Sequence, residues 1–316
     1  MAAPVSPLKP RNTSVVSVGE CMVELARGDD QRFTLSYGGD TFNTAVYLAR
    51  AGIDVSYATA LGDDPYSAGL IALAHRENVH TGLIATLPGR MPGLYLIETS
   101  NGERAFHYWR DRAPARELFE LQQAGSIINA FNQVGVVYFS AITLSLYSRI
   151  GLVRFADALI QARAGGTLIL MDGNYRPRGW PSAGQARETL KRFWTLSDVA
   201  LPTFDDEAQL WGDANPQATA DRLFALGIRE VAIKLGNAGA LAGSAGAMAP
   251  VAPSASIEPI DTTGAGDSFN AAYLAARLGG QPIGAAVRAG NALAGVVIRF
   301  RGAIVPKDAT SALLNP

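Results

Sequence analysis

A glycine-rich turn directly before a helix is the part of this sequence best suited to chemistry. In DTTGAGDSFNAAYLAARLGG (261–280), a Gly-Ala-Gly turn precedes a run of helical periodicity that begins at Asp267. Unpaired amides at such a helix start attract an anion, and glycines let a phosphate approach the backbone. We expect the same field to keep Asp267 ionised, so that it can accept a proton from an alcohol. The segment predicts phosphoryl transfer, with an ordinary tight turn before a helix as the alternative.

A second helix start carries a matching set of polar residues. In YGGDTFNTAVYLARAG (37–52), Gly38 and Gly39 precede Asp40 and Asn43. Residues three apart lie on one face of a helix, so the carboxylate and the amide should point the same way. The pair is suited to binding hydroxyl groups. Helix capping is the alternative, because Asp and Asn are preferred at helix starts.

Alternating strand and helix patterns indicate the scaffold that must position these residues. Apolar runs rich in β-branched residues occur at 14–19, 55–62, 135–141, 167–174, 198–203 and 230–236, and helical periodicity occurs at 41–50, 66–76, 151–163 and 217–226. This alternation predicts the α/β class, with a mainly parallel central sheet covered by helices on both faces. Ligand-binding loops are then expected at the carboxyl edge of the sheet.

Two stretches break the alternation and predict a separate small sheet. They lie at 22–39 and 92–110, and the second contains Ser-Asn-Gly (100–102), a strong hairpin signal. We expect lid segments at approximately 22–37 and 92–110, inserted in a single domain that spans 1–316. The proline-containing start, 1–12, is expected to be a disordered leader.

Three glycine motifs in this chain resemble those of the ribokinase/PfkB carbohydrate kinase family. They are Gly38-Gly39-Asp40 with Asn43, Lys234-Leu-Gly236-Asn-Ala-Gly239, and Asp261-Thr-Thr-Gly264-Ala-Gly-Asp267. The likeness runs from about Val15 to Pro306. It implies a ribokinase-like three-layer α/β/α sandwich with a small β-sheet lid, ATP as the phosphoryl donor and Mg²⁺ as the cofactor, while activation by a monovalent cation stays open. Six more segments resemble the branch that phosphorylates a keto-deoxy sugar acid: GECMVEL, GGDTFNTAVYLAR, PGLYLIET, GERAFHYWR, NYRPRGW and RGAIVP.

The resemblance also implies a role for individual residues. Asp267 is the implied catalytic base and also contacts the sugar, and the implied anion hole consists of Gly264, Ala265 and Gly266. The implied sugar-binding residues near the N-terminus are Gly38, Gly39, Asp40 and Asn43. The residues implied to border the nucleotide are Lys234, Gly236, Gly239 and Asn291, with Asn291 near the adenine. Asn174 and Arg176 are implied to lie between the sugar and the phosphates.

The alternation of residues along the predicted lid strands bears on the charge of the sugar. Tyr108 and Arg110 alternate along a predicted strand and therefore point to one face, which Tyr95 joins if the cross-strand register allows. A planar guanidinium donates two parallel hydrogen bonds to a carboxylate. Arg176 leaves the end of the 167–174 strand on the same side as Asn174. Together these residues predict a sugar acid as substrate, and the alternative is that both arginines are surface charges.

The metal site departs from the family pattern. Many family members carry Asn-x-x-Glu where this chain has Thr203-Phe-Asp-Asp206-Glu207. Either Asp206 or Glu207 substitutes as a water-mediated ligand of Mg²⁺, or the cluster only complements a helix dipole.

The composition of the chain bears on which partners it can bind and where in the cell it is expected. The 27 basic and 28 acidic residues give a net charge of −1, which offers no positive field for nucleic acid. The uncharged stretch 235–257 is rich in Ala, Gly, Ser and Pro, so we expect turns and short strands there, not a membrane span. With Cys21 as the one cysteine, no intrachain disulfide forms and a cytoplasmic location is expected. The partners are a sugar acid, ATP and, because related lids pair between subunits, a second copy in a dimer or a multiple of it.

Three other functions remain as alternatives. A kinase for a neutral sugar or a nucleoside, such as a fructokinase or a ribokinase-like enzyme, would not need the two arginines. A nicotinamide-dependent oxidoreductase would need G-x-G-x-x-G after the first strand, and SVVSVGECMVELA lacks it. A non-catalytic sugar sensor would be expected to have lost the base or the glycines, and both are present.

Overall fold

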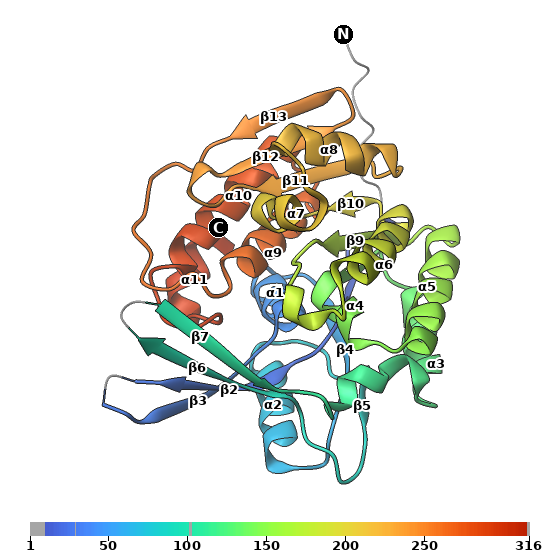
Figure 1. Cartoon of the computed structure of the whole chain (residues 1–316), viewed down its shortest axis with the longest axis vertical. Coiled ribbons are helices and arrows are strands. Elements are labelled where there is room, and N and C mark those ends of the chain that lie inside the picture. Colours follow the sequence, from blue (N-terminus) through green and yellow to red (C-terminus); the bar gives the residue numbers. More distant parts are fainter. Residues whose placement is uncertain (1–9, 29, 101–102, 315–316) are drawn as a thin grey trace.

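The computed structural model of the chain describes residues 10–28, 30–100 and 103–314, and it contains two β-sheets (Figure 1). The large sheet has nine strands in the order β13-β12-β11-β10-β9-β8-β1-β4-β5. Their bounds are β1 Val15–Val18, β4 Val55–Leu61, β5 Ile84–Thr86, β8 Val136–Ser140, β9 Leu168–Asp172, β10 Val199–Ala200, β11 Glu230–Lys234, β12 Ala240–Ser244 and β13 Ala247–Val251. All neighbouring pairs from β5 to β11 are parallel, and β12 and β13 add an antiparallel edge.

Helices cover both faces of the large sheet, which gives three layers (Figure 1). One face packs against α1 Asp40–Arg50, α2 Pro65–Arg76, α9 Ala265–Leu278, α10 Ile283–Val297 and α11 Lys307–Leu314. The other face packs against α3 Ala124–Phe131, α4 Ala141–Leu146, α5 Arg149–Ala164, α6 Ala183–Leu196, α7 Phe204–Trp211 and α8 Pro216–Ala225. Because both faces are covered, a central strand such as β8 is buried along its whole length. The predicted α/β/α class is confirmed.

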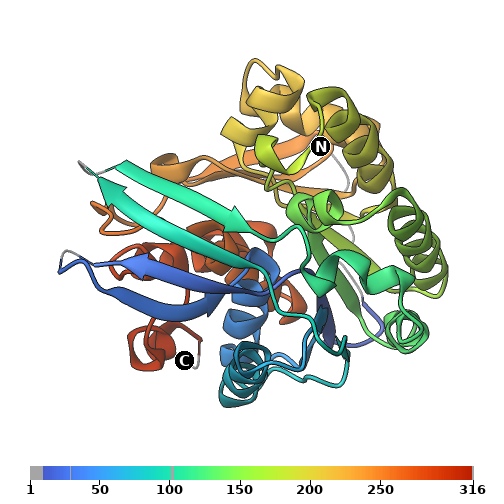
Figure 2. The same cartoon turned by 60° about the horizontal axis from the view of Figure 1, so that its bottom comes forward.

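The small sheet has four strands in the order β3-β2-β6-β7 and projects from the main body (Figure 2). The strands are β2 Met22–Arg27, β3 Phe33–Gly38, β6 Leu94–Ser100 and β7 Glu103–Trp109. β6 and β7 pair as an antiparallel hairpin with Tyr95 opposite Tyr108. The prediction of a separate small sheet is confirmed, while the turn residues Asn101 and Gly102 lie outside the described residues.

Most predicted elements are present, and the differences are local. The strand predicted at 198–203 is reduced to Val199–Ala200, and the uncharged stretch 235–257 contains β12 and β13. Of the expected leader, residues 1–9 lie outside the described part. Arg11 and Asn12 do not belong to such a leader, because their side chains donate hydrogen bonds to the carbonyls of Asn132 and Gln133. In the described ranges, no helix combines the length and the apolar character needed to cross a membrane.

Candidate active site

The glycine turn before α9 is held in a conformation that requires glycine. Gly264 precedes the helix with φ 76°, in the left-handed region, and no side chain caps the helix start. A Cβ at this position would lie 2.8 Å from the Cα atom of Ala303. The Asp261 carboxylate joins the two segments, since it accepts hydrogen bonds from the amides of Thr263 and Gly302, both at 2.7 Å. The first-turn amides of α9 are therefore presented by a rigid turn.

Asp267 lies in the first turn of α9 and is almost fully buried, with 9% of its surface exposed. Its Oδ2 accepts a hydrogen bond of 2.8 Å from the Nδ2 group of Asn43 on α1. Burial, followed by the nearby charge of Asp40, raises the pKa of Asp267 to about 7, although the Asn43 hydrogen bond opposes this shift. Burial therefore opposes the ionised form that the sequence predicts for this carboxylate. A pKa near neutrality suits a general base.

The residues of the two helix starts lie together, and several of their side chains are hydrogen-bonded to one another. Asp40 accepts a hydrogen bond of 2.9 Å from Asn174, which follows β9. Burial is the largest cause of the raised pKa of Asp40, and hydrogen bonds from Ser140 and Asn174 oppose it. Asn43 also accepts from the amide of Gly39 at 3.4 Å, so its side chain bridges α1 and α9. Asn43 thus orients Asp267 directly.

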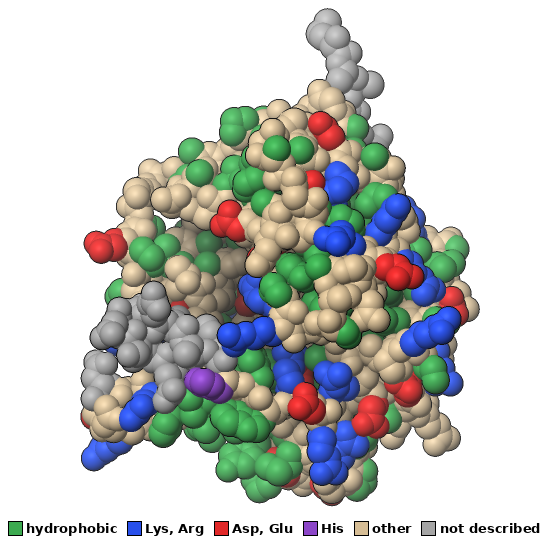
Figure 3. All heavy atoms as spheres, in the orientation of Figure 1, with side chains coloured by type: hydrophobic (Ala, Val, Ile, Leu, Met, Phe, Trp, Pro, Cys, Tyr) green, Lys and Arg blue, Asp and Glu red, His purple; other side chains and the backbone are tan. Residues whose placement is uncertain are grey.

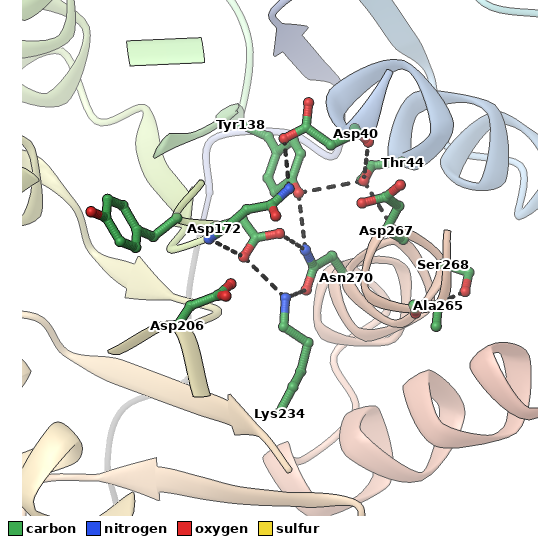
Figure 4. Close-up of polar contacts among 12 residues, drawn as sticks. Asp40, Thr44, Tyr138, Asp172, Asp206, Lys234, Ala265, Asp267, Ser268 and Asn270 are labelled. Atoms are coloured by element: carbon green, nitrogen blue, oxygen red, sulfur yellow. Dashed lines mark hydrogen bonds and ion pairs between the residues drawn. The ribbon is translucent and has the colours of Figure 1, made fainter. Parts of the chain in front are cut away.

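A buried network of hydrogen bonds and one ion pair supports the residues of the two helix starts (Figure 4). The Lys234 ammonium lies 3.0 Å from both the Asp172 carboxylate and the Asn270 side-chain oxygen. Asn270 in turn donates to Asp172 at 2.7 Å and to the Tyr138 hydroxyl at 3.0 Å. The Thr44 hydroxyl contacts the Tyr138 hydroxyl at 3.4 Å. The network ties α1 and α9 to the middle of β8 and to the ends of β9 and β11, which fixes the position of Asp267.

The residues expected to border a nucleotide extend along β11 and α10. A Cβ on Gly266 would lie 3.7 Å from the Lys234 ammonium, so this cation lies close beneath the glycine turn. Gly236 and Gly239 have φ 57° and 87°, and they form the tight loop between β11 and β12. Asn291 donates to the carbonyl of Val251 at 3.2 Å, and a Cβ on Gly239 would lie 2.2 Å from the same carbonyl oxygen. The loop and Asn291 are therefore neighbours. Lys234 itself is buried, in an ion pair with Asp172.

The small sheet presents Tyr95 and Tyr108 on one face, because the strand register, which the sequence left open, places them directly opposite one another. Their rings lie 5.9 Å apart. The Tyr95 hydroxyl donates to the buried carboxylate of Glu24, which also accepts from Ser36 at 2.7 Å. A Cβ on Gly38 would lie 2.9 Å from the Tyr95 hydroxyl, so the sheet approaches the start of α1 closely. Tyr95 can only accept a hydrogen bond from a ligand, because its proton is already directed to Glu24.

Both arginines expected to bind the acid group already have carboxylate partners. Arg110 forms an ion pair with Glu20, whose side chain is 2% exposed. Arg176 donates to both carboxylate oxygens of Asp206 at 3.1 Å. Arg110 also lies over the ring of Tyr108, with the guanidinium carbon 5.7 Å from the ring centre. The two guanidinium groups are therefore oriented before any ligand binds.

The two acidic residues considered for the metal have different surroundings. Glu207 is buried, and its carboxylate accepts from Arg222 on α8 at 2.7 Å. Burial raises the pKa of Glu207 to about 7 despite this partner. Asp206 instead lies near Lys234 and Asp172 (Figure 4). Among the residues that the structure describes, no group of three or more His, Cys, Asp or Glu side chains could hold a metal ion by itself.

The surface is hollowed between the small sheet and the main body, over the region where α1 and α9 meet (Figures 1 and 3). Most of the predicted site residues come together around these helix starts and the adjoining strand ends, whereas Glu207 faces α8. Sequence reasoning missed Glu20 and Glu24, although both belong to the GECMVEL segment. It also assigned no role to Asn270, which lies one helical turn after Asp267 and could have been found by that spacing.

Comparisons with known proteins identify the family to which this chain belongs. The sequence model described as pfkB family carbohydrate kinase matches residues 12–310. The 2-dehydro-3-deoxygluconokinase of Escherichia coli is 38% identical over 307 residues, 94% of this chain and 99% of that protein. The enzyme of the same name from Dickeya dadantii is 38% identical over 95% of this chain and 99% of its own length.

Solved structures share the fold at lower identity. The 2-dehydro-3-deoxygluconokinase of Thermotoga maritima has a TM-score of 0.84 at 23% identity, covering 97% of this chain and 99% of that one. A fructokinase from Vibrio cholerae, solved with fructose, ADP and calcium, has a TM-score of 0.82 at 22% identity, covering 96% and 99%. Given the match over nearly the whole sequence, this chain belongs to the PfkB family of carbohydrate kinases.

Proposed function

We propose that the protein transfers the γ-phosphoryl group of ATP to the 6-hydroxyl of 2-keto-3-deoxy-D-gluconate, which gives 2-keto-3-deoxy-6-phosphogluconate. The observation that carries the proposal is the Asp267 carboxylate, which is buried at an uncapped helix start and has a pKa of about 7. The names of the relatives at 38% identity support this choice of sugar acid.

In the proposed reaction, Asp267 removes the proton of the attacking hydroxyl. The oxygen–phosphorus bond forms as the bond from the γ-phosphorus to the bridging oxygen breaks, and ADP leaves. The amides that follow Gly264 donate hydrogen bonds to the phosphoryl oxygens, whose negative charge the helix dipole also favours. Positioning of the two substrates supplies most of the remaining acceleration.

Mg²⁺ is the proposed cofactor, and Asp206 is the residue that would hold it through water. Its carboxylate is partly exposed, with 17% of the side chain accessible, whereas Glu207 is occupied by Arg222. A single protein carboxylate suits Mg²⁺, which keeps several waters and binds substrate phosphates in such sites. When bound, the ion would supply positive charge beside the phosphates.

Arg110 and Arg176 are the proposed partners of the sugar carboxylate. Their side chains are 18% and 56% exposed. In Arg110 the Nε and Nη2 atoms are buried, so Nη1 is the group that would reach a ligand while Glu20 holds Nη2. A guanidinium has five N–H donors and can serve two carboxylates at once. Tyr108 and the acceptor oxygen of Tyr95 would contact the sugar hydroxyl groups.

A kinase for a neutral sugar is the second candidate, and one observation favours it. Both arginines are already neutralised by Glu20 and Asp206, so the site does not require an anionic ligand to balance them. Fructokinase-2 of Zea mays is 27% identical over 82% of this chain and 78% of its own length.

An assay of ADP release separates the two candidates. The purified protein is incubated with ATP, Mg²⁺ and one acceptor at a time: 2-keto-3-deoxygluconate, fructose, ribose, gluconate or adenosine. We expect the highest kcat/KM with 2-keto-3-deoxygluconate. A higher kcat/KM for a neutral acceptor would replace the proposed substrate. ADP release at the same rate with and without an acceptor would show ATP hydrolysis and would contradict phosphoryl transfer to any of these acceptors.

We also propose a cytoplasmic location and a dimeric assembly, or a multiple of a dimer. The location is supported by the use of ATP as donor. The assembly is supported by the exposed apolar side chains of Leu35 and Trp109 on the small sheet.

A further inference from the structure

We propose that Glu20 is a positioning residue that holds Arg110 ready for the carboxylate of a sugar acid, and so sets the preference for an anionic substrate without touching it. This inference rests on the proposed function. Glu20 lies between β1 and β2, where the chain leaves the large sheet for the small one.

The buried carboxylate of Glu20 has Arg110 as its direct partner. Its side chain is 2% exposed, and it forms an ion pair with Arg110. Apart from that pair, neither carboxylate oxygen of Glu20 has a hydrogen-bond partner within the described ranges. Arg116 also favours the ionised form of Glu20, but Arg110 is its direct ion-pair partner. Separating a buried carboxylate from its direct partner would leave a poorly compensated charge away from water.

Neighbouring glycines close the space around this pair. A Cβ on Gly93 would lie 2.8 Å from Oε1 of Glu20 and 3.1 Å from Cβ of Arg110. A Cβ on Gly39 would lie 2.1 Å from the carbonyl oxygen of Glu20. The start of β6 is therefore packed tightly against the Glu20 carboxylate, which restricts where it can point, and the start of α1 is packed against the Glu20 backbone.

Arg110 is fixed from two sides by this arrangement. Glu20 binds its Nη2 group, and the ring of Tyr108 lies 5.7 Å from its guanidinium carbon. A free arginine side chain loses considerable rotamer freedom when it binds a ligand, whereas a fixed one has already lost it. Because Nε and Nη2 of Arg110 are buried, the Nη1 group is the donor left for the substrate, and it is held in one orientation.

Because of this ion pair, replacing Arg110 would have two effects at once. Removing Arg110 would both delete a substrate contact and strand the buried carboxylate of Glu20, so its effect alone cannot measure recognition of the acid. Glu20→Gln is the cleaner change, because the amide keeps the shape and a neutral hydrogen bond while it removes the charge.

The test compares 2-keto-3-deoxygluconate with 3-deoxyfructose, which carries CH₂OH in place of the carboxylate. For Glu20→Gln we expect KM for the acid to rise about tenfold and kcat to change less than about threefold, with KM for 3-deoxyfructose and for ATP unaffected. Glu117→Gln, which alters a Glu–Arg pair with Arg90 on the surface, is the matched control and should leave every constant unchanged.

A double-mutant cycle decides whether Glu20 acts through Arg110. In the Arg110→Gln background, Glu20→Gln should have no further effect on KM for the acid. An additive effect, an equal rise for both sugars, or a lower KM for the acid would overturn the inference. If Glu20→Gln does not fold, Gly93→Ala, which pushes against the same pair, must produce the same KM signature. Failure of the wild type to phosphorylate the acid would instead overturn the proposed function.

Discussion

Asp267 is the residue on which the proposed chemistry depends most directly. Asp267→Asn keeps the shape of the side chain and removes its ability to accept the proton. We expect kcat to fall by at least about a thousandfold while the affinity for ATP stays within about threefold. Turnover gives the first quantity and titration calorimetry the second. Near-normal turnover would show that another group is the base.

The pKa of Asp267 predicts the pH dependence of the reaction. A general base acts in its ionised form, so kcat/KM should fall about tenfold per unit as the pH decreases below about 7. The hydrogen bond from Asn43 favours the ionised form, so Asn43→Ala should raise the pKa and move this acidic limb to higher pH. Rate profiles between pH 5 and 9 measure the shift. A limb that does not move, or that moves to lower pH, would contradict the assigned cause.

The two neighbouring acidic residues provide a matched pair for the metal. Asp206→Asn should raise the Mg²⁺ concentration needed for half-maximal rate, because it weakens the proposed water-mediated ligand. Glu207→Gln should leave that concentration unchanged, since the Glu207 side chain is directed to Arg222. The comparison is made by titrating Mg²⁺ at saturating ATP and sugar. The reverse pattern would assign the metal to Glu207.

At the scale of elements, the start of α9 depends on a glycine in a confined space. Gly264→Ala places a side chain at φ 76° and 2.8 Å from Ala303, so we expect a loss of at least about 2 kcal/mol of stability and most of the activity. Gly280 follows the end of the same helix with φ 78°, and a Cβ there would have nothing within 4 Å. Gly280→Ala should therefore cost only about 1 kcal/mol and leave kcat unchanged. Thermal unfolding and turnover of both variants provide the measurements, and equal losses of activity would contradict the steric argument.

The sequence predicts those parts of the site whose signal is local. The turn at Gly264 and the base at Asp267 are adjacent in the chain, and the strand and helix periods around them are regular. Glu20 has no such signal, because its partner Arg110 lies 90 positions away and the pairing depends on how the small sheet folds back. The pKa of Asp267 is likewise set by burial and by Asp40, which only the assembled fold brings near.

At the scale of the whole molecule, the small sheet has two chemically different faces. The face with Glu24, Tyr95 and Tyr108 combines polar groups with a small buried cluster around Met22 and Ile97, and it adjoins the start of α1. By the alternation of the strands, the opposite face carries Leu35 and Trp109, which are 45% and 61% exposed. Apolar side chains grouped on an exposed sheet favour association with another protein surface. A second copy of this chain is the simplest partner, since closed symmetric dimers are the commonest assemblies.

If two copies of the chain associate through this face, a charged side chain placed on it should separate them. The wild type should have about twice the 33.3 kDa mass of one chain in light scattering, independent of concentration in the micromolar range. Leu35→Glu should shift the mass toward one chain, because two carboxylates would be brought into an apolar interface without partners. Ile150→Glu is the control, since Ile150 on α5 is 58% exposed and lies on the main body. If both variants stay dimeric, or if the wild type is monomeric, the small sheet does not join the subunits.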